Sequence, residues 1–181
     1  MKATGIVRRI DELGRVVIPK EIRRTLRMRE GDPLEIFVDR NGEVVLKKYS
    51  PIGEMTNVAK EIVESMHESA GHITIISDKD EIIALAGVPK AQYLNKQISA
   101  TLEDVMEDRR TLYQPKGGFY EIAKNQKEEF HSLVVAPIVA GGDPVGTITM
   151  INPDPKYVMS GFEKTMAETA ATFLSKHLSA D

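Results

Sequence analysis

Residues 5–26 read GIVRRIDELGRVVIPKEIRRTL, and this stretch decides the fold expected at the N-terminus. Val and Ile are concentrated at 5–10 and again at 15–18, with Asp-Glu-Leu-Gly between them at 11–14. Short runs of β-branched residues around such a turn-forming segment predict two short strands joined by a turn. The N-terminal part of the chain is therefore expected to be mainly β.

A short helix is predicted to follow, from Pro19 to Leu26. Proline suits the first helical position because the N–H that it lacks would find no partner there. Ile22 and Leu26 lie one turn apart, so they form the inner face of this helix. Arg23 and Arg24 fall off that face and are expected to point towards solvent or a ligand.

Charge is distributed unevenly along a chain of 181 residues whose formal net charge is −3. Residues 1–29 hold nine Lys and Arg against three Asp and Glu, a net charge of +6. Residues 51–181 hold twelve against nineteen, a net charge of −7. A cationic head on an acidic body places an anionic partner, most simply nucleic acid, at the N-terminus.

A hairpin is predicted next, with strands at 34–40 and 43–49 on either side of Asn41-Gly42. Asn-Gly is the preferred pair for a two-residue type I′ turn, which would set Val38 opposite Val45. Apolar residues would then lie on both faces of the hairpin. A hairpin at the surface of a monomer needs apolar residues on one face only. Because about fifty residues also bury little core alone, this unit is expected to fold only as an oligomer. The other predicted pairs are Phe37 with Leu46, Ile36 with Lys47, Asp39 with Val44, and Glu35 with Lys48.

A second domain is expected beyond a junction at 51–55, where Ser50-Pro51 starts a helix. That helix carries an apolar stripe and stops at Gly71. A last helix begins at Ser160, whose capping box is completed by Glu163. The first stripe consists of Met55, Val58, Ala59, Ile62 and Met66, and the last of Phe162, Met166, Ala170, Phe173, Leu174 and His177.

Between these helices the pattern predicts mostly strands. Two of them, 133–139 and 145–151, flank a Gly-Gly-Asp-Pro segment at 141–144, which is typical of a hairpin turn. This segment lacks the Lys-Ser or Lys-Thr of a phosphate-binding loop. The remaining predictions are strands at 72–77 and 81–86, a helix-leaning region at 89–110 and a Gly-rich stretch at 115–118.

Several classes of chemistry find no support in the sequence. The chain has no cysteine, which excludes disulfides, thiolate metal sites and cysteine nucleophiles. It has no Gly-x-Ser-x-Gly elbow either, so no enzyme activity, metal or cofactor is expected. Without a signal peptide or an apolar run near ~20 residues, a soluble, cytoplasmic protein without membrane contact is expected. Metal-ligand spacing is missing among the histidines, which are His67, His72, His131 and His177.

The Arg-Arg-Ile-Asp-Glu-Leu-Gly-Arg-Val-Val-Ile-Pro core at 8–19 resembles the N-terminal DNA-binding module of the AbrB-like, swapped-hairpin transition-state regulators. The resemblance covers nearly all of residues 1–50. It implies a domain-swapped dimer in which two chains interleave their hairpins into one barrel-like sheet. It also implies degenerate, often AT-rich DNA sites.

The same resemblance implies that cations of this stretch bind double-stranded DNA. Arginine makes bidentate contacts to phosphate or guanine edges that lysine cannot reproduce. The alternative for each is a solvated surface charge paired with Asp11, Glu12 or Glu21. The DNA-binding candidates are Arg8, Arg15, Arg23 and Arg24, with Arg9, Lys20 and Lys2 adding attraction to phosphate.

The second half resembles a GAF domain, on the residues 133–138, the turn at 141–144 and residues 145–148. This resemblance implies an antiparallel sheet flanked by helices, with a small-molecule pocket in the variable segment 87–130. The sequence does not name the ligand. Residues that could line the pocket, or else belong to the core and surface, are Tyr93, Arg109, Arg110, Tyr113, Phe119 and Tyr120.

The prediction is thus an AbrB-like swapped-hairpin DNA-binding domain at 1–50, a junction at 51–55, and an α+β, GAF-like sensor and oligomerisation domain at 56–181. The resemblance implies a transcription regulator of late sporulation at the nucleoid, acting as activator or repressor. Its two striped helices would join swapped dimers into a homotetramer, or else each would only cover its own sheet. Two alternatives stay open: an antitoxin-like regulator that binds a protein, and a ligand-binding enzyme whose basic arm is incidental.

Overall fold

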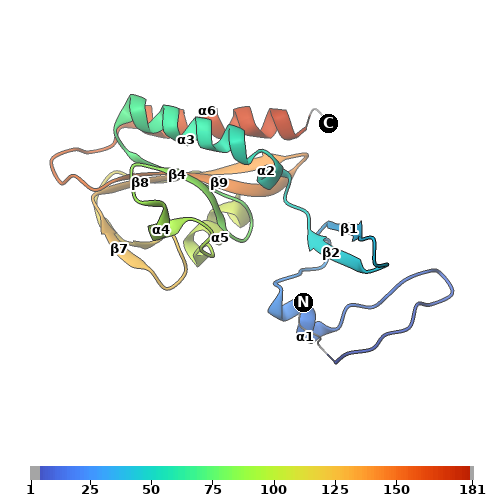
Figure 1. Cartoon of the computed structure of the whole chain (residues 1–181). Helices are drawn as coiled ribbons and strands as arrows, with labels where there is room; N and C mark the ends of the chain where they lie inside the picture. Colours follow the sequence, from blue (N-terminus) through green and yellow to red (C-terminus); the bar gives the residue numbers. More distant parts are fainter. Residues whose placement is uncertain (1–4, 180–181) are drawn as a thin grey trace. The chain divides into compact units, whose positions relative to one another are not determined.

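The computed structural model of the chain describes residues 5–179. It contains two compact units, Met1–Tyr49 and Ser50–Asp181, each of which has its own secondary structure (Figure 1). Within the described residues, no helix is both long enough and apolar enough to cross a membrane.

The first unit begins as an open loop over residues 5–19. The predicted turn at 11–14 is confirmed, since backbone hydrogen bonds of 3.0 Å close it. The predicted strands at 5–10 and 15–18 are wrong for the single chain, because neither arm of the loop forms a strand there (Figure 1). The elements that follow are α1 (Lys20–Thr25), β1 (Leu34–Val38) and β2 (Val44–Lys48).

This unit has almost no core of its own. Among its described residues only Pro19 is buried. The apolar side chains of the arms face solvent instead, with Val7 85% and Val17 71% exposed. Burial of one such side chain stabilises a fold by about 1.5–3 kcal/mol. The single chain lacks most of this stabilisation, because these side chains stay exposed.

The register of the β1–β2 hairpin differs from the prediction by one residue. Val38 pairs with Val44, and the loop has three residues, Arg40 to Gly42, rather than two. The Asp39 carboxylate accepts the backbone N–H groups of Asn41 (2.9 Å) and Glu43 (2.8 Å), and this closes the longer loop. Gly42, at φ +79°, takes the left-handed position that ends such a loop.

The corrected register sorts the apolar side chains of this hairpin. Ile36 now lies opposite Leu46, on the same face as the Val38–Val44 pair, whereas Phe37 shares the other face with Val45. A shift of one residue has this effect because side chains alternate between faces along a strand. Most of the apolar surface of the hairpin is therefore on one face, and that face is exposed in the single chain.

The second unit is built on a five-stranded antiparallel sheet. Its strand order is β4-β3-β9-β8-β5, so the two long strands at its centre come from the end of the chain. These two strands form the predicted hairpin, closed by Gly141 and Gly142 at φ +59° and +90°. The strands are β3 (Ile73–Ser77), β4 (Ile82–Ala86), β5 (Leu112–Gln114), β8 (Ser132–Ala140) and β9 (Asp143–Asn152).

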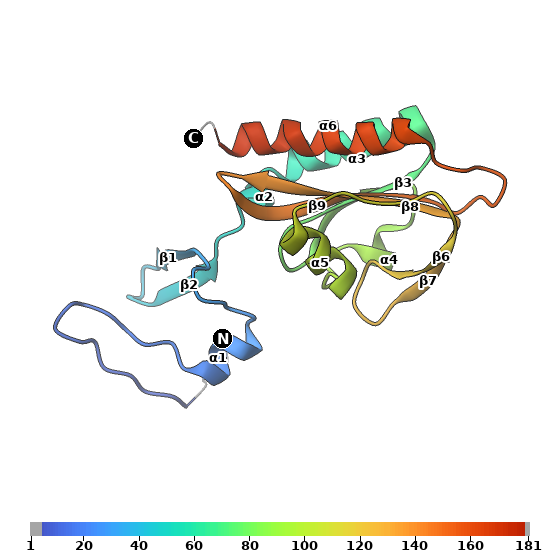
Figure 2. The same ribbon diagram turned by 180° about the vertical axis from the view of Figure 1, so that it is seen from behind.

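Helices cover both faces of this sheet (Figures 1 and 2). On one face α3 (Thr56–Ala70), preceded by α2 (Pro51–Glu54), lies beside α6 (Gly161–Leu178). On the other face lie α4 (Lys90–Tyr93) and α5 (Ala100–Asp108), which divide the single helix-leaning region that was predicted. Gly71, in the left-handed conformation at φ 72°, ends α3 as predicted.

Three strands of this unit were not predicted. They are β5 and a separate hairpin of β6 (Gly118–Glu121) with β7 (Lys127–Phe130). Each has only three or four residues and reads LYQ, GFYE or KEEF, so none carries a run of β-branched residues. Their positions depend on pairing with β8 or with each other, which local sequence does not specify.

Helix α6 has two apolar faces, where the sequence predicted one. It packs on the sheet through Ala167, Ala171 and Leu174, all buried. The predicted stripe is mostly the second face, on which Phe162 is 63% and Phe173 46% exposed. Small residues on the sheet side let the helix approach closely, while its larger apolar side chains remain available to another surface.

The start of α6 is fixed by a buried carboxylate. The predicted capping box is confirmed: Ser160 N donates to Glu163 Oε2 at 2.7 Å, and Ser160 Oγ accepts from Phe162 N. Tyr157 Oη donates to the other carboxylate oxygen, and His72 Nε2 lies 3.6 Å from it. Burial alone would raise the pKa of Glu163, but the hydrogen bonds from Tyr157 and Ser160 outweigh it and hold this pKa at about 2.

Replacing Glu163 with Gln is expected to destabilise the fold in a pH-dependent way. An unfolded glutamate has a pKa near ~4.3, so the lowered pKa of folded Glu163 contributes stability above that pH. This contribution is lost as the pH falls from ~4.3 towards 2. The difference in unfolding free energy between wild type and Glu163→Gln should be on the order of 2 kcal/mol at pH 6 and should shrink towards pH 2, measured by urea unfolding.

Glu168→Gln is the matched control on the same helix. Glu168 makes an exposed pair with Lys164 at 3.9 Å, and such pairs contribute little to stability. A stability difference for Glu163→Gln that stays constant across this pH range would contradict the assigned role of the carboxylate.

Gly146 permits a close approach between β9 and β3. A Cβ atom at this position would lie 2.0 Å from the carbonyl oxygen of Ser77 on β3. Gly146→Ala is therefore expected to lower the unfolding free energy by roughly 2–4 kcal/mol, since the backbone must shift. Gly161→Ala is the control, because no atom lies within 4 Å of the added carbon. Equal thermal midpoints for the two variants would refute this account.

Candidate nucleic-acid interface

The turn between the two arms of the first unit is held by one side chain. Asp11 Oδ1 accepts the backbone N–H groups of Leu13 (3.0 Å) and Arg15 (2.8 Å). The backbone N–H of Asp11 in turn donates to the carbonyl of Arg15 at 3.0 Å. Gly14 adopts φ +77°, a left-handed conformation that a glycine reaches without strain. Residues 11–15 therefore form a closed turn, and Arg15 lies at its end.

Arg15 also makes an ion pair with the same carboxylate. Its Nε lies 2.8 Å from Asp11 Oδ2, with the arginine side chain 70% and the aspartate side chain 40% exposed. Hydrogen bonds from the backbone and then from the side chain of Arg15 lower the pKa of Asp11. The carboxylate therefore stays charged at neutral pH. The pairing with Asp11, which was the alternative to DNA contact, is present for this arginine in the unbound chain.

Helix α1 carries three further candidates. It begins one residue later than predicted, because Pro19 takes the N-cap position with ψ 147°. Lys20, Arg23 and Arg24 are all exposed, as the helical spacing predicted. On the opposite side Ile22 is only half-buried, and Leu26 is 52% exposed. The helix thus presents its cations to solvent, while its apolar face is incompletely covered within the chain.

The other two candidates lie on the first arm, outside any strand. Arg8 and Arg9 are exposed, and Arg8 Nη1 donates to the neighbouring carbonyl of Val7 at 3.2 Å. Arg8 borders an apolar groove of about 350 Å³. The residues that line this groove come from both arms, from α1 and the segment after it, and from β2: Ile6, Val16, Val17, Ile18, Pro19, Ile22, Leu26, Met28 and Leu46.

The six described candidates are therefore all exposed. Arg15 has an ion pair; among residues 5–179, Arg9, Lys20, Arg23 and Arg24 have none. Lys2, the seventh, lies outside the described residues. Surface cations without partners remain free to neutralise phosphates, which is the main source of affinity in DNA binding.

Sequence reasoning considered the pairing of Asp11 with an arginine, but it missed that the side chain of Asp11 also closes the turn. The signal was present, because an aspartate two and four residues before backbone N–H groups of a tight turn commonly accepts from them. It also missed Met28 and Leu46 as parts of the apolar groove. These two residues come from separate elements, so their meeting depends on the tertiary fold.

The pocket candidates of the second unit do not form one site. Tyr93 is buried in the cluster under α4 and α5, where its hydroxyl donates to Glu128 at 2.7 Å. Burial and this carboxylate raise the pKa of Tyr93. Tyr113 packs against the cluster on the α3 and α6 face instead, and donates to the carbonyl of Met159 at 2.7 Å. Phe119 is 63% exposed. The core-and-surface alternative therefore describes these three residues.

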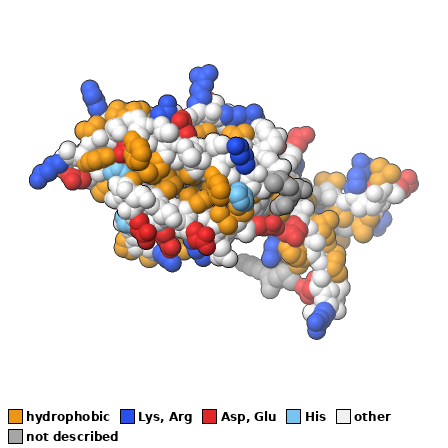
Figure 3. All heavy atoms as spheres, turned by 90° about the horizontal axis from the view of Figure 1, so that it is seen from above, with side chains coloured by type: hydrophobic (Ala, Val, Ile, Leu, Met, Phe, Trp, Pro, Cys, Tyr) orange, Lys and Arg blue, Asp and Glu red, His pale blue; other side chains and the backbone are white. Residues whose placement is uncertain are grey.

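A second apolar groove runs between α3 and α6, with a volume of about 620 Å³. Figure 3 looks onto this face and shows hydrophobic side chains gathered between the two helices. Glu61 is the charged residue among those that line it. The others, which are apolar or carry small hydroxyls, are Val58, Ile62, Ser65, Met66, Phe162, Thr165, Met166, Thr169, Ala170 and Phe173.

The histidines are scattered over the second unit. His72 is buried beside Glu163, and His67 contacts the carbonyl of His72 through Nδ1 at 2.8 Å. His177 packs its ring on Phe173 with 4.3 Å between centroids. In the part of the chain that the structure describes, no three His, Asp or Glu residues are arranged to hold a metal ion.

Two family models match the chain, one for each unit. The family described as "Stage V sporulation protein T C-terminal, transcription factor" matches residues 54–179. The family described as "Antidote-toxin recognition MazE, bacterial antitoxin" matches residues 7–54. The first match covers more than half of the chain.

Relatives extend this likeness over both units. The chain is 52% identical over 178 residues to stage V sporulation protein T of Bacillus subtilis (strain 168), covering 98% of this chain and 99% of that protein. It is 51% identical over 78 residues to the transition state regulatory protein AbrB of the same organism, covering 42% of this chain and 78% of that protein.

Solved structures identify the fold of the second unit. The GAF domain of a phosphoenolpyruvate-protein phosphotransferase from Acinetobacter is 13% identical, with a TM-score of 0.57, and the match covers 68% of this chain and 81% of that one. The second unit therefore has a GAF fold, and the first is of the AbrB type. By its sequence and by the fold of both units, the chain belongs to the stage V sporulation protein T family.

Proposed function

We propose that this protein is a DNA-binding transcription regulator of sporulation. The observation that carries the proposal is the first unit, which has the six exposed candidate cations and an apolar groove that the chain does not fill. The printed description of the matching family, a transcription factor, supports the same function. The protein would act in the cytoplasm, on nucleoid DNA, and as a binder rather than an enzyme.

The first unit is proposed to work as a domain-swapped dimer. Its arms at 5–10 and 15–18 have strand-forming sequences but form no strand among the described residues, and Val7 and Val17 are largely exposed. The arms of a second copy could pair with them and fill the apolar groove. Such an exchange would bury the apolar face of the β1–β2 hairpin and would place two sets of the six cations on one assembly.

The proposed DNA contacts are Arg8, Arg15, Arg23 and Arg24, assisted by Arg9 and Lys20. Helix α1 has six residues, which is short for a recognition helix in the major groove. Readout would therefore depend on phosphate contacts and on the flexibility of AT-rich sequence, with few base contacts. Neutralising ~6–8 phosphates corresponds to a slope of log K against log salt of about −5 to −7.

The second unit is proposed to join these dimers into a tetramer through the groove between α3 and α6. The occupant would be the same face of a second copy, which would give a four-helix interface. An open groove rich in apolar side chains favours such a surface, and the two-faced α6 supplies it without loss of its own packing on the sheet. Sensing of a small ligand by the GAF fold is a further part of the proposal, although the candidate residues Tyr93 and Tyr113 lie on opposite faces of the sheet.

The alternative function is that of an antitoxin, because an antitoxin family model matches residues 7–54. Antitoxins of this type follow the module with a short toxin-binding tail, an expectation from the resemblance. In this chain the module is followed by a compact unit from Ser50 to Asp181. A folded domain of that size favours a regulator that responds through its second unit.

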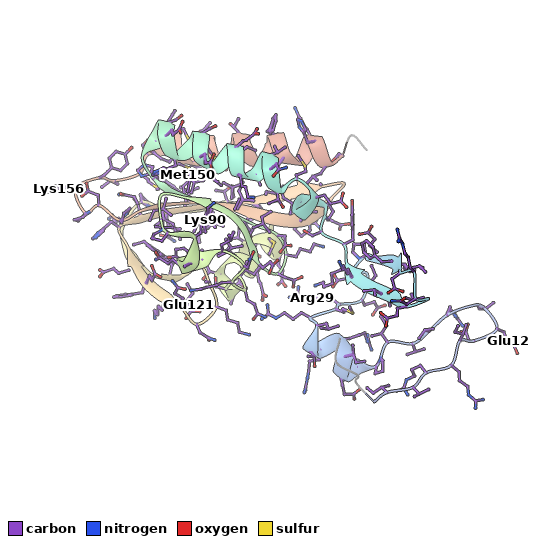
Figure 4. The ribbon with its side chains drawn as sticks, viewed as in Figure 1. Glu12, Arg29, Lys90, Glu121, Met150 and Lys156 are labelled. Carbon is purple, nitrogen blue, oxygen red and sulfur yellow. The ribbon has the colours of Figure 1, made fainter. Side chains whose placement is uncertain are left out.

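Removing single arginines from the first unit is expected to weaken DNA binding. Arg15→Ala and Arg23→Ala should each reduce affinity for an AT-rich duplex by roughly tenfold and lower the salt slope by about one for each phosphate that is no longer neutralised. Fluorescence anisotropy at several salt concentrations measures both quantities. Lys156→Ala, in the second unit (labelled in Figure 4), removes one charge elsewhere and should change neither. Binding that persists unchanged in both arginine variants would overturn the DNA-binding role of this cluster.

A charge placed in the α3–α6 groove is expected to convert the proposed tetramer into a dimer. Ala170→Glu puts a carboxylate on the apolar face of the groove, where a second copy would have to bury it. Thr172→Glu is the control, on the exposed side of the same helix. Sedimentation should give a tetramer for wild type and Thr172→Glu, and a dimer for Ala170→Glu. A tetramer in all three proteins would exclude this groove as the interface.

A further inference from the structure

We propose that Asp11 is a positioning residue for DNA binding, which holds Arg15 by its Nε so that the outer edge of the guanidinium faces the duplex. The inference rests on the proposed function and adds a residue to it. The carboxylate would otherwise be out of place, because a negative charge beside a DNA-contacting arginine repels phosphate.

The position of the carboxylate is set by the backbone of the turn. Oδ1 accepts the N–H groups of Leu13 and Arg15 at 3.0 and 2.8 Å, and the turn is closed by two further backbone hydrogen bonds of 3.0 Å. The carboxylate therefore has a defined place before the side chain of Arg15 meets it. Its other oxygen, Oδ2, is directed at Nε of Arg15 at 2.8 Å.

This contact leaves the guanidinium able to bind DNA. Arginine has five N–H donors, and the Nε contact uses one of them. The four on Nη1 and Nη2 form the fork that matches two phosphate oxygens or a guanine edge. Because the Arg15 side chain is 70% exposed, that fork is accessible while the aspartate holds the stem. A long, flexible side chain is thereby given one direction before binding.

Stability does not account for the pair. Exposed ion pairs contribute little to folding, and the turn is already held by its backbone contacts. The neighbouring Glu12 provides the comparison, because it lies at the tip of the same loop (Figure 4). Within the described residues Glu12 makes no hydrogen bond or ion pair, so its charge can only repel DNA.

Charge and positioning predict opposite results for the variant Asp11→Asn. Asparagine keeps the Oδ1 acceptor of the turn and removes one negative charge. If charge alone mattered, this variant would bind DNA more tightly, as Glu12→Gln is expected to do. If Asp11 positions Arg15, Asp11→Asn should bind AT-rich duplex about tenfold more weakly, the scale of one charge-assisted hydrogen bond.

A double-mutant cycle with Arg15→Ala tests the coupling. Asp11→Asn should weaken binding when Arg15 is present and should leave it unchanged or tighter in the Arg15→Ala background. Arg15→Lys should not restore wild-type affinity, because lysine has no Nε branch to be held. The salt slope of Asp11→Asn should fall towards that of Arg15→Ala, a change that a purely structural role would not produce if the thermal midpoint is kept.

The outcomes separate this inference from the proposed function. If wild type does not bind the duplex, or Arg15→Ala binds as tightly as wild type, the DNA-contacting role of Arg15 fails and the inference fails with it. If Arg15→Ala weakens binding but Asp11→Asn binds as tightly as Glu12→Gln, positioning is overturned and the proposed function stands. Equal weakening by Asp11→Asn in both backgrounds would mean that it disturbs the module, and this also overturns positioning.

Discussion

The apolar side chains of residues 5–18 have no place to be buried within their own chain, and the first unit depends on this constraint. Its described residues bury only Pro19, although Val, Ile and Leu are frequent there. A segment of this length cannot form a stable domain without more burial. The exposed arms and the unfilled groove beside α1 both result from this lack of apolar burial. The proposed swapped dimer resolves both, and it places the cations on a surface that a single chain could not hold rigid.

The second unit meets the opposite condition, since it has a complete core and apolar surface left over. Its sheet is covered on one face by α4 and α5 and on the other by α3 and α6. Alanines on α6 face the sheet, and phenylalanines of the same helix face outwards. A helix with this division can stabilise its own domain and still offer a surface to another copy.

The sequence was sufficient for features that depend on local chemistry. The turn at 11–14, the end of α3 at Gly71 and the capping box at Ser160 all follow from short-range backbone rules. Prediction from the sequence failed where two local rules compete. In the β1–β2 hairpin, the side chain of Asp39 favours a three-residue loop over the two-residue turn that Asn41-Gly42 predicts. Prediction failed also where partners are distant, as for β5 to β7, which have only three or four residues each and depend on pairing with β8 or with each other.

Helices α3 and α6 are the first and last long elements of their unit, ending at Ala70 and Leu178. The groove between them therefore cannot exist until the ribosome has synthesised α6. The arms of the first unit emerge long before, and at ~5–20 residues per second the interval is on the order of 10 s. Neighbouring nascent chains on one messenger could exchange arms during that time, whereas any pairing through the groove must wait until α6 has been synthesised. The order of synthesis would thus allow the contact between arms to form well before the contact between grooves.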